Sequence, residues 1–142
     1  MIRWLLACLS LSLLSAPAFA DTNIAGQWTF SANVSSDCTF GGSAHLEKTG
    51  DTTFKGELTA RQSCVSLPED YLVRQDCNAS VLGNQLSVRC RIVEFVNGFE
   101  SPFYAPDNFT LTIQSASRMH GALVSAGSVM PAEWKRAEGG IS

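Results

Sequence analysis

The cysteines are the residues of this sequence whose type and spacing point most directly to chemistry. Besides Cys8 near the start, the chain contains Cys38, Cys64, Cys77 and Cys90. Four cysteines can hold a zinc ion, but structural zinc sites usually contain closely spaced C-x-x-C pairs, and this sequence has none. An even number of well-separated cysteines is typical of a small exported domain, so we expect two disulfides.

The two histidines give no sign of a catalytic or metal site. His45 and His120 both fall on the polar side of alternating segments, and no second set of ligands converges on either. The sequence has no G-x-S-x-G motif, no H-E-x-x-H motif and no phosphate-binding glycine loop. We therefore predict no catalytic residue, no metal ligand and no cofactor, and we rank an enzyme of unknown type third among the functions considered.

Three aromatic side chains, Phe99, Phe103 and Tyr104, are the best candidates for binding. They lie in residues 99–108, a segment with two prolines that suits an ordered surface loop better than an inner strand. Aromatic residues at the mouth of a barrel suit a small apolar ligand or a partner protein. The alternative is that these rings only cap a solid barrel, because an eight-stranded interior can be filled by side chains.

Residues 1–20 have the features of a signal peptide. Arg3 precedes an apolar run at residues 5–14, which is too short to span a bilayer, and Ala18-Phe19-Ala20 is a suitable cleavage site. We predict a mature barrel domain over residues 21–136 and a disordered tail over residues 137–142, in the periplasm or secreted. Removing Arg3 from ten basic residues leaves nine against thirteen acidic ones, a net charge of −4 with no basic cluster. We therefore expect no nucleic-acid partner and no membrane insertion after signal cleavage.

The segment from Cys77 to Cys90 can be assigned as a β-hairpin from its residues alone. Gly83-Asn84 is a two-residue loop with glycine first, as a type II′ turn requires. With this turn, Val81 faces Leu86 and the two cysteines face each other, on a side that is wholly apolar. Only Leu82 breaks the alternation of apolar and polar residues.

A second hairpin is predicted from strands at residues 43–48 and 54–61, joined by a turn at residues 49–52. The register that sets Leu46 opposite Gly56 also brings Cys38 opposite Cys64, if the strand continues through the glycines at residues 41–42. Four cysteines allow three pairings. The two registers together favour Cys38 with Cys64 and Cys77 with Cys90.

The remaining segments also alternate with the period of strands. We predict a first strand at residues 24–34, a short edge strand at residues 71–73, a hairpin that pairs Ile113 with Met119, and a last strand at residues 132–136. A change of apolar face near Ile92 predicts a β-bulge or a corner there. No helical period of useful length is present, so the sequence predicts an all-β fold. A sandwich is one solution, and we favour an antiparallel up-and-down β-barrel of about eight strands.

Two short motifs resemble the calycin pattern of lipocalins, avidins and small bacterial barrels. They are Gly26-Gln27-Trp28 in the first strand and Trp134-Lys135-Arg136 in the last. The resemblance implies that Trp28 closes one barrel end and that Arg136 packs over it, in a cation–π contact worth roughly 0.5–2 kcal/mol. The chain is shorter than a lipocalin and lacks that family's later T-D-Y-type motif, which argues against a large ligand cavity.

By size and by its disulfides the chain is equally similar to the periplasmic metalloprotease inhibitors, barrels whose N-terminal segment enters the protease cleft. This resemblance implies partner contacts at Asp21, Thr22 and Asn23. We therefore expect an exported, non-catalytic, lipocalin-like or avidin-like barrel that binds a small apolar ligand at its mouth. The alternative is a protein-interaction module such as a periplasmic protease inhibitor.

Overall fold

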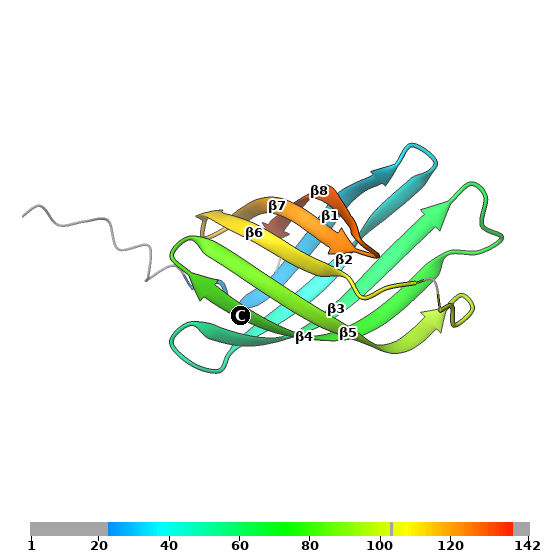
Figure 1. The fold of residues 1–142 in the computed structure, drawn as a ribbon. Coiled ribbons are helices and arrows are strands. Elements are labelled where there is room, and N and C mark those ends of the chain that lie inside the picture. The colour runs from blue at the N-terminus through cyan, green and yellow to red at the C-terminus, as the bar shows by residue number, and fades with distance from the viewer. Residues whose placement is uncertain (1–22, 103, 138–142) are drawn as a thin grey trace, which may run out of the picture.

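The computed structural model describes residues 23–102 and 104–137. Eight antiparallel strands follow one another in chain order, and the last pairs with the first to close a barrel (Figure 1). They are β1 (Gly26–Ser35), β2 (Cys38–Lys48), β3 (Thr53–Cys64), β4 (Tyr71–Leu82), β5 (Gln85–Asn97), β6 (Asn108–Ser115), β7 (Arg118–Ser125) and β8 (Ser128–Arg136). The predicted all-β barrel is confirmed, and the sandwich is excluded.

The predicted signal peptide lies outside the described residues, as does the predicted tail apart from Ala137. In the described part of the chain, no helix is long and apolar enough to cross a membrane.

The β4–β5 hairpin has the predicted register. Val81 lies opposite Leu86 around the two-residue turn, and the strand partners Cys77 and Cys90 form a disulfide. At the turn, Gly83 has a φ of +62°, a conformation that glycine adopts without steric cost. The side chain that broke the alternation, Leu82, is 85% exposed.

The β2–β3 hairpin also has the predicted register, with Leu46 opposite Gly56 and Cys38 opposite Cys64. The second disulfide joins Cys38 to Cys64, so both predicted pairings are confirmed. Two disulfides are typical of proteins from an oxidising, extracellular or periplasmic environment.

β2 starts at Cys38 and runs through Gly41 and Gly42, whereas the sequence analysis placed the strand after them. At Gly42 an added Cβ atom would overlap the carbonyl oxygen of Thr59 on β3 and lie 2.7 Å from the Phe30 ring on β1. Glycine is therefore the residue that lets the neighbouring strands approach here, and it does not interrupt the strand.

The edge strand predicted at residues 71–73 is wrong. These residues begin β4, which lies between β3 and β5 in the closed barrel. Arg74, a charge within this strand, lies 3.1 Å from Glu94 on β5.

The other strand predictions agree more closely with the structure. The β4–β5 register shifts between Ile92 and Glu94, which confirms the bulge near Ile92, and Ile113 pairs with Met119 as predicted. The last strand begins earlier than predicted, at Ser128.

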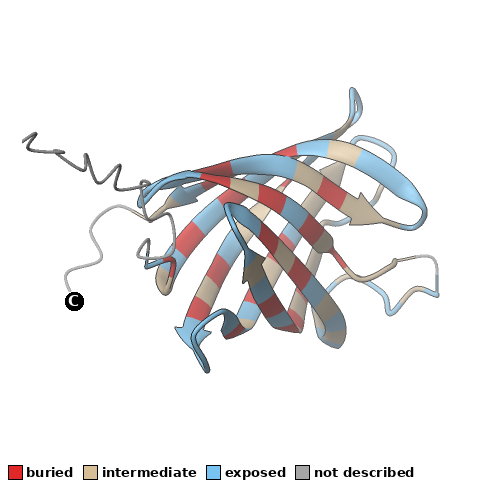
Figure 2. Cartoon of the chain, turned by 60° about the vertical axis from the view of Figure 1, so that its left-hand side comes forward, coloured by how far each residue is buried: buried red, intermediate tan, exposed pale blue. Residues whose placement is uncertain are grey.

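Buried and exposed residues alternate along the strands, as Figure 2 shows, so one side chain in two points into the barrel. Aromatic rings fill the interior around Phe30, whose ring centroid lies 5.3 Å from Phe109 and 5.6 Å from Trp134. Trp134 lies 6.4 Å from Trp28, and both are fully buried. This half of the barrel is therefore a packed core.

The barrel end near Trp28 is closed by Arg136. The guanidinium carbon lies 4.5 Å from the centre of the Trp28 ring. The same group donates three hydrogen bonds of 2.7–2.8 Å to carbonyl oxygens, those of Asn23, Ala25 and Ala116. Gly26 has a φ of +117°, and an added Cβ atom would lie 2.9 Å from Arg136 Nη1. Gly26, Trp28 and Arg136 therefore lie together at this closed end.

Candidate functional site

The opposite end of the barrel is the mouth. Four connections meet there, the turns at residues 36–37 and 126–127 and the loops at residues 65–70 and 98–107 (Figure 1). A cavity of about 240 Å³ opens at this end. Its apolar wall is formed by Val34, Phe40, Leu123 and Met130.

A buried polar cluster borders this cavity. Gln75 is fully buried and Asp107 is 3% exposed. Gln75 Nε2 donates to Asp107 Oδ2 at 2.7 Å, and the Asp107 backbone N–H donates to Gln75 Oε1 at 2.9 Å. The Tyr104 hydroxyl donates to the same Asp107 Oδ2 at 2.9 Å. These bonds join β4 to the end of the β5–β6 loop.

The loop that carries Tyr104 and Asp107 is fixed from two sides. The Tyr104 ring lies 5.4 Å from Tyr71 on β4 and 5.9 Å from Phe95 on β5, distances at which aromatic rings attract one another. On the other side the Ser125 hydroxyl donates to the carbonyl oxygen of Pro106 at 3.1 Å. The two polar groups are therefore held in place at the cavity wall.

Asp107 is a buried carboxyl group with neutral partners. Burial raises its pKa to about 6, although hydrogen bonds from Gln75 and Tyr104 lower it in part. The pKa of Tyr104 is raised above its ordinary value by burial and by the neighbouring Asp107 carboxylate. Among the described residues that line the cavity there is no Lys, Arg or His. At neutral pH the mouth therefore holds one buried negative charge without a cationic partner.

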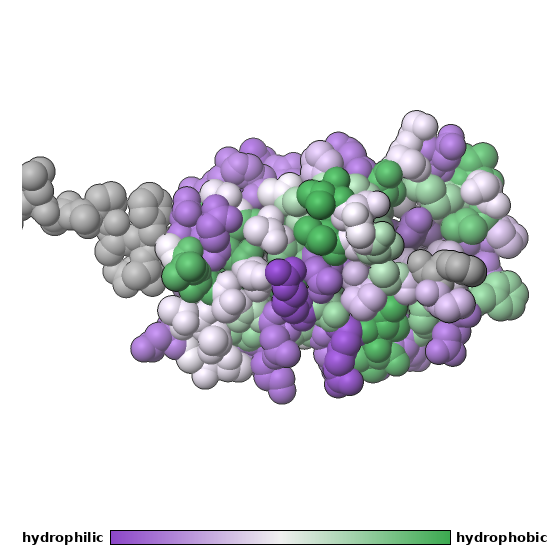
Figure 3. Space-filling view, in the orientation of Figure 1, coloured by the Kyte–Doolittle hydropathy of each residue, from purple (hydrophilic) through white to green (hydrophobic). Residues whose placement is uncertain are grey.

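Of the three aromatic residues predicted for binding, the structure brings Tyr104 to the cavity. Phe99 is 74% exposed and is not part of the cavity lining. Phe103 lies outside the described residues. Val93 and Val96 in the last part of β5 are also exposed, at 42% and 51%. On the face seen in Figure 3, hydrophobic side chains form separate small patches between hydrophilic ones.

The N-terminal contact residues lie near the closed end. Asp21 and Thr22 are outside the described residues. The carbonyl oxygen of Asn23 accepts from Arg136 at 2.8 Å, and its Oδ1 accepts from the Ala25 N–H at 3.0 Å. Because Asn23 is tied to the barrel, a segment that entered a partner's cleft would have to precede it.

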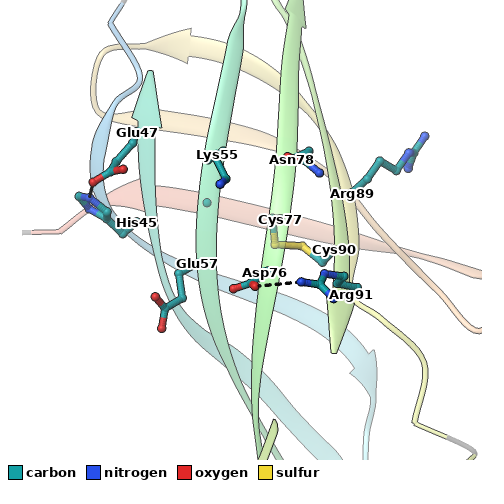
Figure 4. Close-up of a pocket in the computed structure, with 11 residues that line it drawn as sticks. His45, Glu47, Lys55, Glu57, Asp76, Cys77, Asn78, Arg89, Cys90 and Arg91 are labelled. Carbon is teal, nitrogen blue, oxygen red and sulfur yellow. Dashed lines mark hydrogen bonds and ion pairs between the residues drawn. A yellow bond between two sulfur atoms is a disulfide. The ribbon is translucent and has the colours of Figure 1, made fainter. Parts of the chain in front are cut away.

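A larger depression of about 740 Å³ lies over β2, β3, β4 and β5 (Figure 4). Three acidic and three basic side chains line it, namely Glu47, Glu57, Asp76, Lys55, Arg89 and Arg91. The Asp76 and Arg91 side chains lie 3.5 Å apart, and exposed ion pairs of this kind contribute about 0–1 kcal/mol. Because the opposite charges balance, this depression gives no reason to expect a charged ligand.

The histidines are placed as predicted. His45 lies opposite Glu57 and His120 opposite Thr112. His45 Nδ1 lies 2.9 Å from Gln27 Nε2, and its Nε2 lies 3.5 Å from Glu47. Within residues 23–102 and 104–137, no group of three His, Cys, Asp or Glu side chains could hold a metal ion.

Sequence reasoning missed Gln75 and Asp107. The inward position of Gln75 could have been predicted from the alternation along β4. Gln75 lies two and four residues before Cys77 and Ala79, so it shares their inward face if the strand begins before Cys77. Asp107 follows a proline at the end of a loop, a position that is usually exposed. Its burial depends on the partner that Gln75 supplies from another strand.

No family model and no curated protein sequence matches this chain. Solved structures of designed proteins do. A de novo designed fluorescence-activating β-barrel is 14% identical with a TM-score of 0.61, covering 83% of this chain and 96% of that one. The redesigned β-barrel mFAP1, bound to DFHBI, is 11% identical with a TM-score of 0.56, covering 80% and 94%. At these identities the similarity shows the fold alone, a closed antiparallel β-barrel.

Proposed function

We propose that this protein is an exported, non-catalytic barrel that binds a small, largely apolar ligand in the mouth cavity. The observation that carries the proposal is the cavity itself, which combines an apolar wall with the fixed polar groups of Tyr104 and Asp107. Ligand sites in proteins usually have this composition, a mostly apolar concave surface with a few well-placed polar groups.

The fold is compatible with such a role. The redesigned barrel mFAP1 carries the small molecule DFHBI, so a barrel of this architecture can hold a ligand. The contact between Arg136 and Trp28 supports a calycin-type barrel, in which one end is closed and the other is free for binding. The two disulfides and the signal-like residues 1–20 support a periplasmic or secreted location.

The absence of catalysis is part of the proposal. Asp107 could exchange a proton near neutral pH, but general acid–base chemistry on a substrate usually needs a second group or a nucleophile beside it. In the described part of the chain the side chains that face it are Gln75, Tyr104 and Ser125. The Ser125 hydroxyl is directed to backbone carbonyl oxygens, so it lacks the adjacent base that activates a serine.

The test is saturable binding of a fluorescent apolar probe. The substitution Met130→Trp should fill the cavity and weaken the probe at least about tenfold, since the lost volume is a large share of a site this small. Leu82→Trp, at an exposed position at the other end of the barrel, is the matched control and should leave binding unchanged. Equal binding by both variants would place the ligand elsewhere and refute the proposal.

A second candidate function is a protein-interaction module. The observation that favours it is that three large apolar side chains, Val93, Val96 and Phe99, are exposed in and just after the part of β5 that extends beyond its pairing with β6. Partner-binding surfaces commonly contain such exposed apolar side chains. The protease-inhibitor version places the contact at the N-terminus instead.

Two variants separate these versions in a pull-down from the periplasmic or secreted fraction of the host. Val96→Asp should abolish capture of a partner that uses the end of β5. Deletion of Asp21 and Thr22, with Asn23 kept because it is bonded to Arg136, should abolish capture of a protease. If neither change affects a demonstrated partner, both versions are wrong.

A further inference from the structure

We propose that the mouth cavity selects a small one-ring ligand with a protonated amine, whose cationic group binds Asp107 and whose ring packs against Phe40, Leu123 and Met130. This inference rests on the proposed function, because it specifies the chemical class of ligand for the same cavity.

The first reason to expect a cationic ligand is the charge of Asp107 at the cavity wall. Asp107 is 3% exposed, and the described residues around the cavity place no cationic side chain beside it. A buried carboxylate without a cationic partner is unfavourable, and burial raises the pKa of this group to about 6 for that reason. A ligand that brings its own positive charge would therefore be favoured over a neutral one.

The second reason is that the Asp107 carboxylate can accept a further hydrogen bond from a ligand. An ionised carboxylate can accept about four hydrogen bonds. Gln75 and Tyr104 both donate to Oδ2, and the Ser125 hydroxyl is directed to the carbonyl oxygens of Ala105 and Pro106. Acceptor capacity therefore remains for an N–H group of a ligand, and a bond between two charged groups is stronger than a neutral one.

The volume of the cavity and the negative charge of Asp107 define the other properties of the ligand. A cavity of about 240 Å³ is smaller than the 300–1,000 Å³ typical of drug-sized ligands, so it suits a single ring with a short substituent. Phe40 and Leu123 are almost fully buried and offer an apolar surface to that ring. An anionic head group would face the Asp107 carboxylate and be repelled.

Three compounds of matched size test the proposal by isothermal titration calorimetry at pH 7.5: benzylamine, benzyl alcohol and benzoate. The amine is protonated at this pH, as alkyl amines of the lysine type are. We expect benzylamine to bind about tenfold more tightly than benzyl alcohol, because a charged hydrogen bond is the stronger one. Benzoate should bind more weakly than either.

Asp107→Asn should reduce the difference between benzylamine and benzyl alcohol to less than about twofold, since it removes the charge and keeps the shape. Asp51→Asn is the matched control, because Asp51 is exposed in the β2–β3 turn at the closed end. If Asp107→Asn does not fold, the wild-type protein at pH 4.5 gives the same information. At that pH Asp107 is protonated, and the other side chains that face it, Gln75, Tyr104 and Ser125, do not change charge.

The outcomes separate this inference from the proposed function. Tighter binding of benzylamine that depends on Asp107 supports both. If benzyl alcohol binds as tightly as benzylamine or more tightly, and Met130→Trp abolishes this binding, the preference for an amine is wrong. The proposal that ligands bind in the mouth cavity then still holds. Binding of all three compounds that is insensitive to both Asp107→Asn and Met130→Trp, or no binding of any, overturns both.

Discussion

Asp107 makes the stability of this barrel depend on pH in a direction opposite to that of most carboxyl groups. Its pKa is raised from 3.8 to about 6 in the folded protein. Between these values the folded state binds more protons than the unfolded state, so the free energy of unfolding falls as the pH rises through this window. The stabilisation is complete below about pH 4 and is lost above about pH 6. The substitution Asp107→Asn removes this dependence.

The magnitude follows from the difference between the two pKa values. They differ by about 2.2, and each pKa unit corresponds to about 1.36 kcal/mol, so the full effect is about 3 kcal/mol. Roughly 2.5 kcal/mol of this should appear between pH 4 and pH 7.5, where both proteins can be studied. Because Asp107 is almost fully buried, solvent screening does not reduce the effect substantially.

Urea denaturation of both proteins at pH 4, 5, 6 and 7.5 measures this difference. Groups other than Asp107 are common to both proteins, so their contributions cancel in the comparison. We expect the variant to gain about 2.5 kcal/mol relative to wild type as the pH rises from 4 to 7.5. Asp51→Asn, at an exposed position in the β2–β3 turn, is the control for an Asp-to-Asn change away from the mouth. If the stability of Asp107→Asn relative to wild type stays constant or decreases as the pH rises, this account of the mouth is refuted.

The remaining predictions concern the scaffold and are measured by the same denaturation experiment. Arg136→Ala should cost about 2–3 kcal/mol, because it removes three hydrogen bonds and the cation–π contact, and Arg136→Lys should recover little of that loss. Replacing Cys77 and Cys90 together with Ala should cost about 2–3 kcal/mol, and a smaller loss than 1 kcal/mol would contradict the loop-closure estimate. Gly42→Ala should cost about 3 kcal/mol because the new methyl group overlaps β3, whereas Gly83→Ala, in an open turn with positive φ, should cost about 1 kcal/mol. Equal losses for the two glycines would show that the clash at Gly42 is relieved.

The barrel was predictable from the sequence because its hairpins specify their own registers. The turn at Gly83 fixes the pairing of Cys77 with Cys90, and the apolar parity of β2 and β3 fixes that of Cys38 with Cys64. Each of these inferences uses local information, a turn type and a period of two residues. Strand β4 was underestimated because its charged residues, such as Arg74, resemble those of a loop when the neighbouring strands are unknown.

The polar cluster at the mouth was not predictable in the same way. Tyr104 was identified from its loop, but its position depends on the rings of Tyr71 and Phe95 from two strands. Asp107 is buried only because Gln75 approaches it from a residue 32 positions away. Contacts of this kind are set by how the closed barrel brings distant segments together. The sequence pattern reports burial along one strand and does not report what lies across the barrel.

The central claim is that ligands bind at the mouth, and amide chemical shifts test it most directly. Benzylamine is titrated into the ¹⁵N-labelled protein at pH 7.5 and the perturbed signals are mapped onto the barrel. We expect the saturable shifts to gather at Phe40, Asp107 and Leu123, around the mouth cavity. Shifts centred on the charged depression near Lys55 and Arg89, or no saturable shift at the mouth with any one-ring compound tested, would contradict the claim.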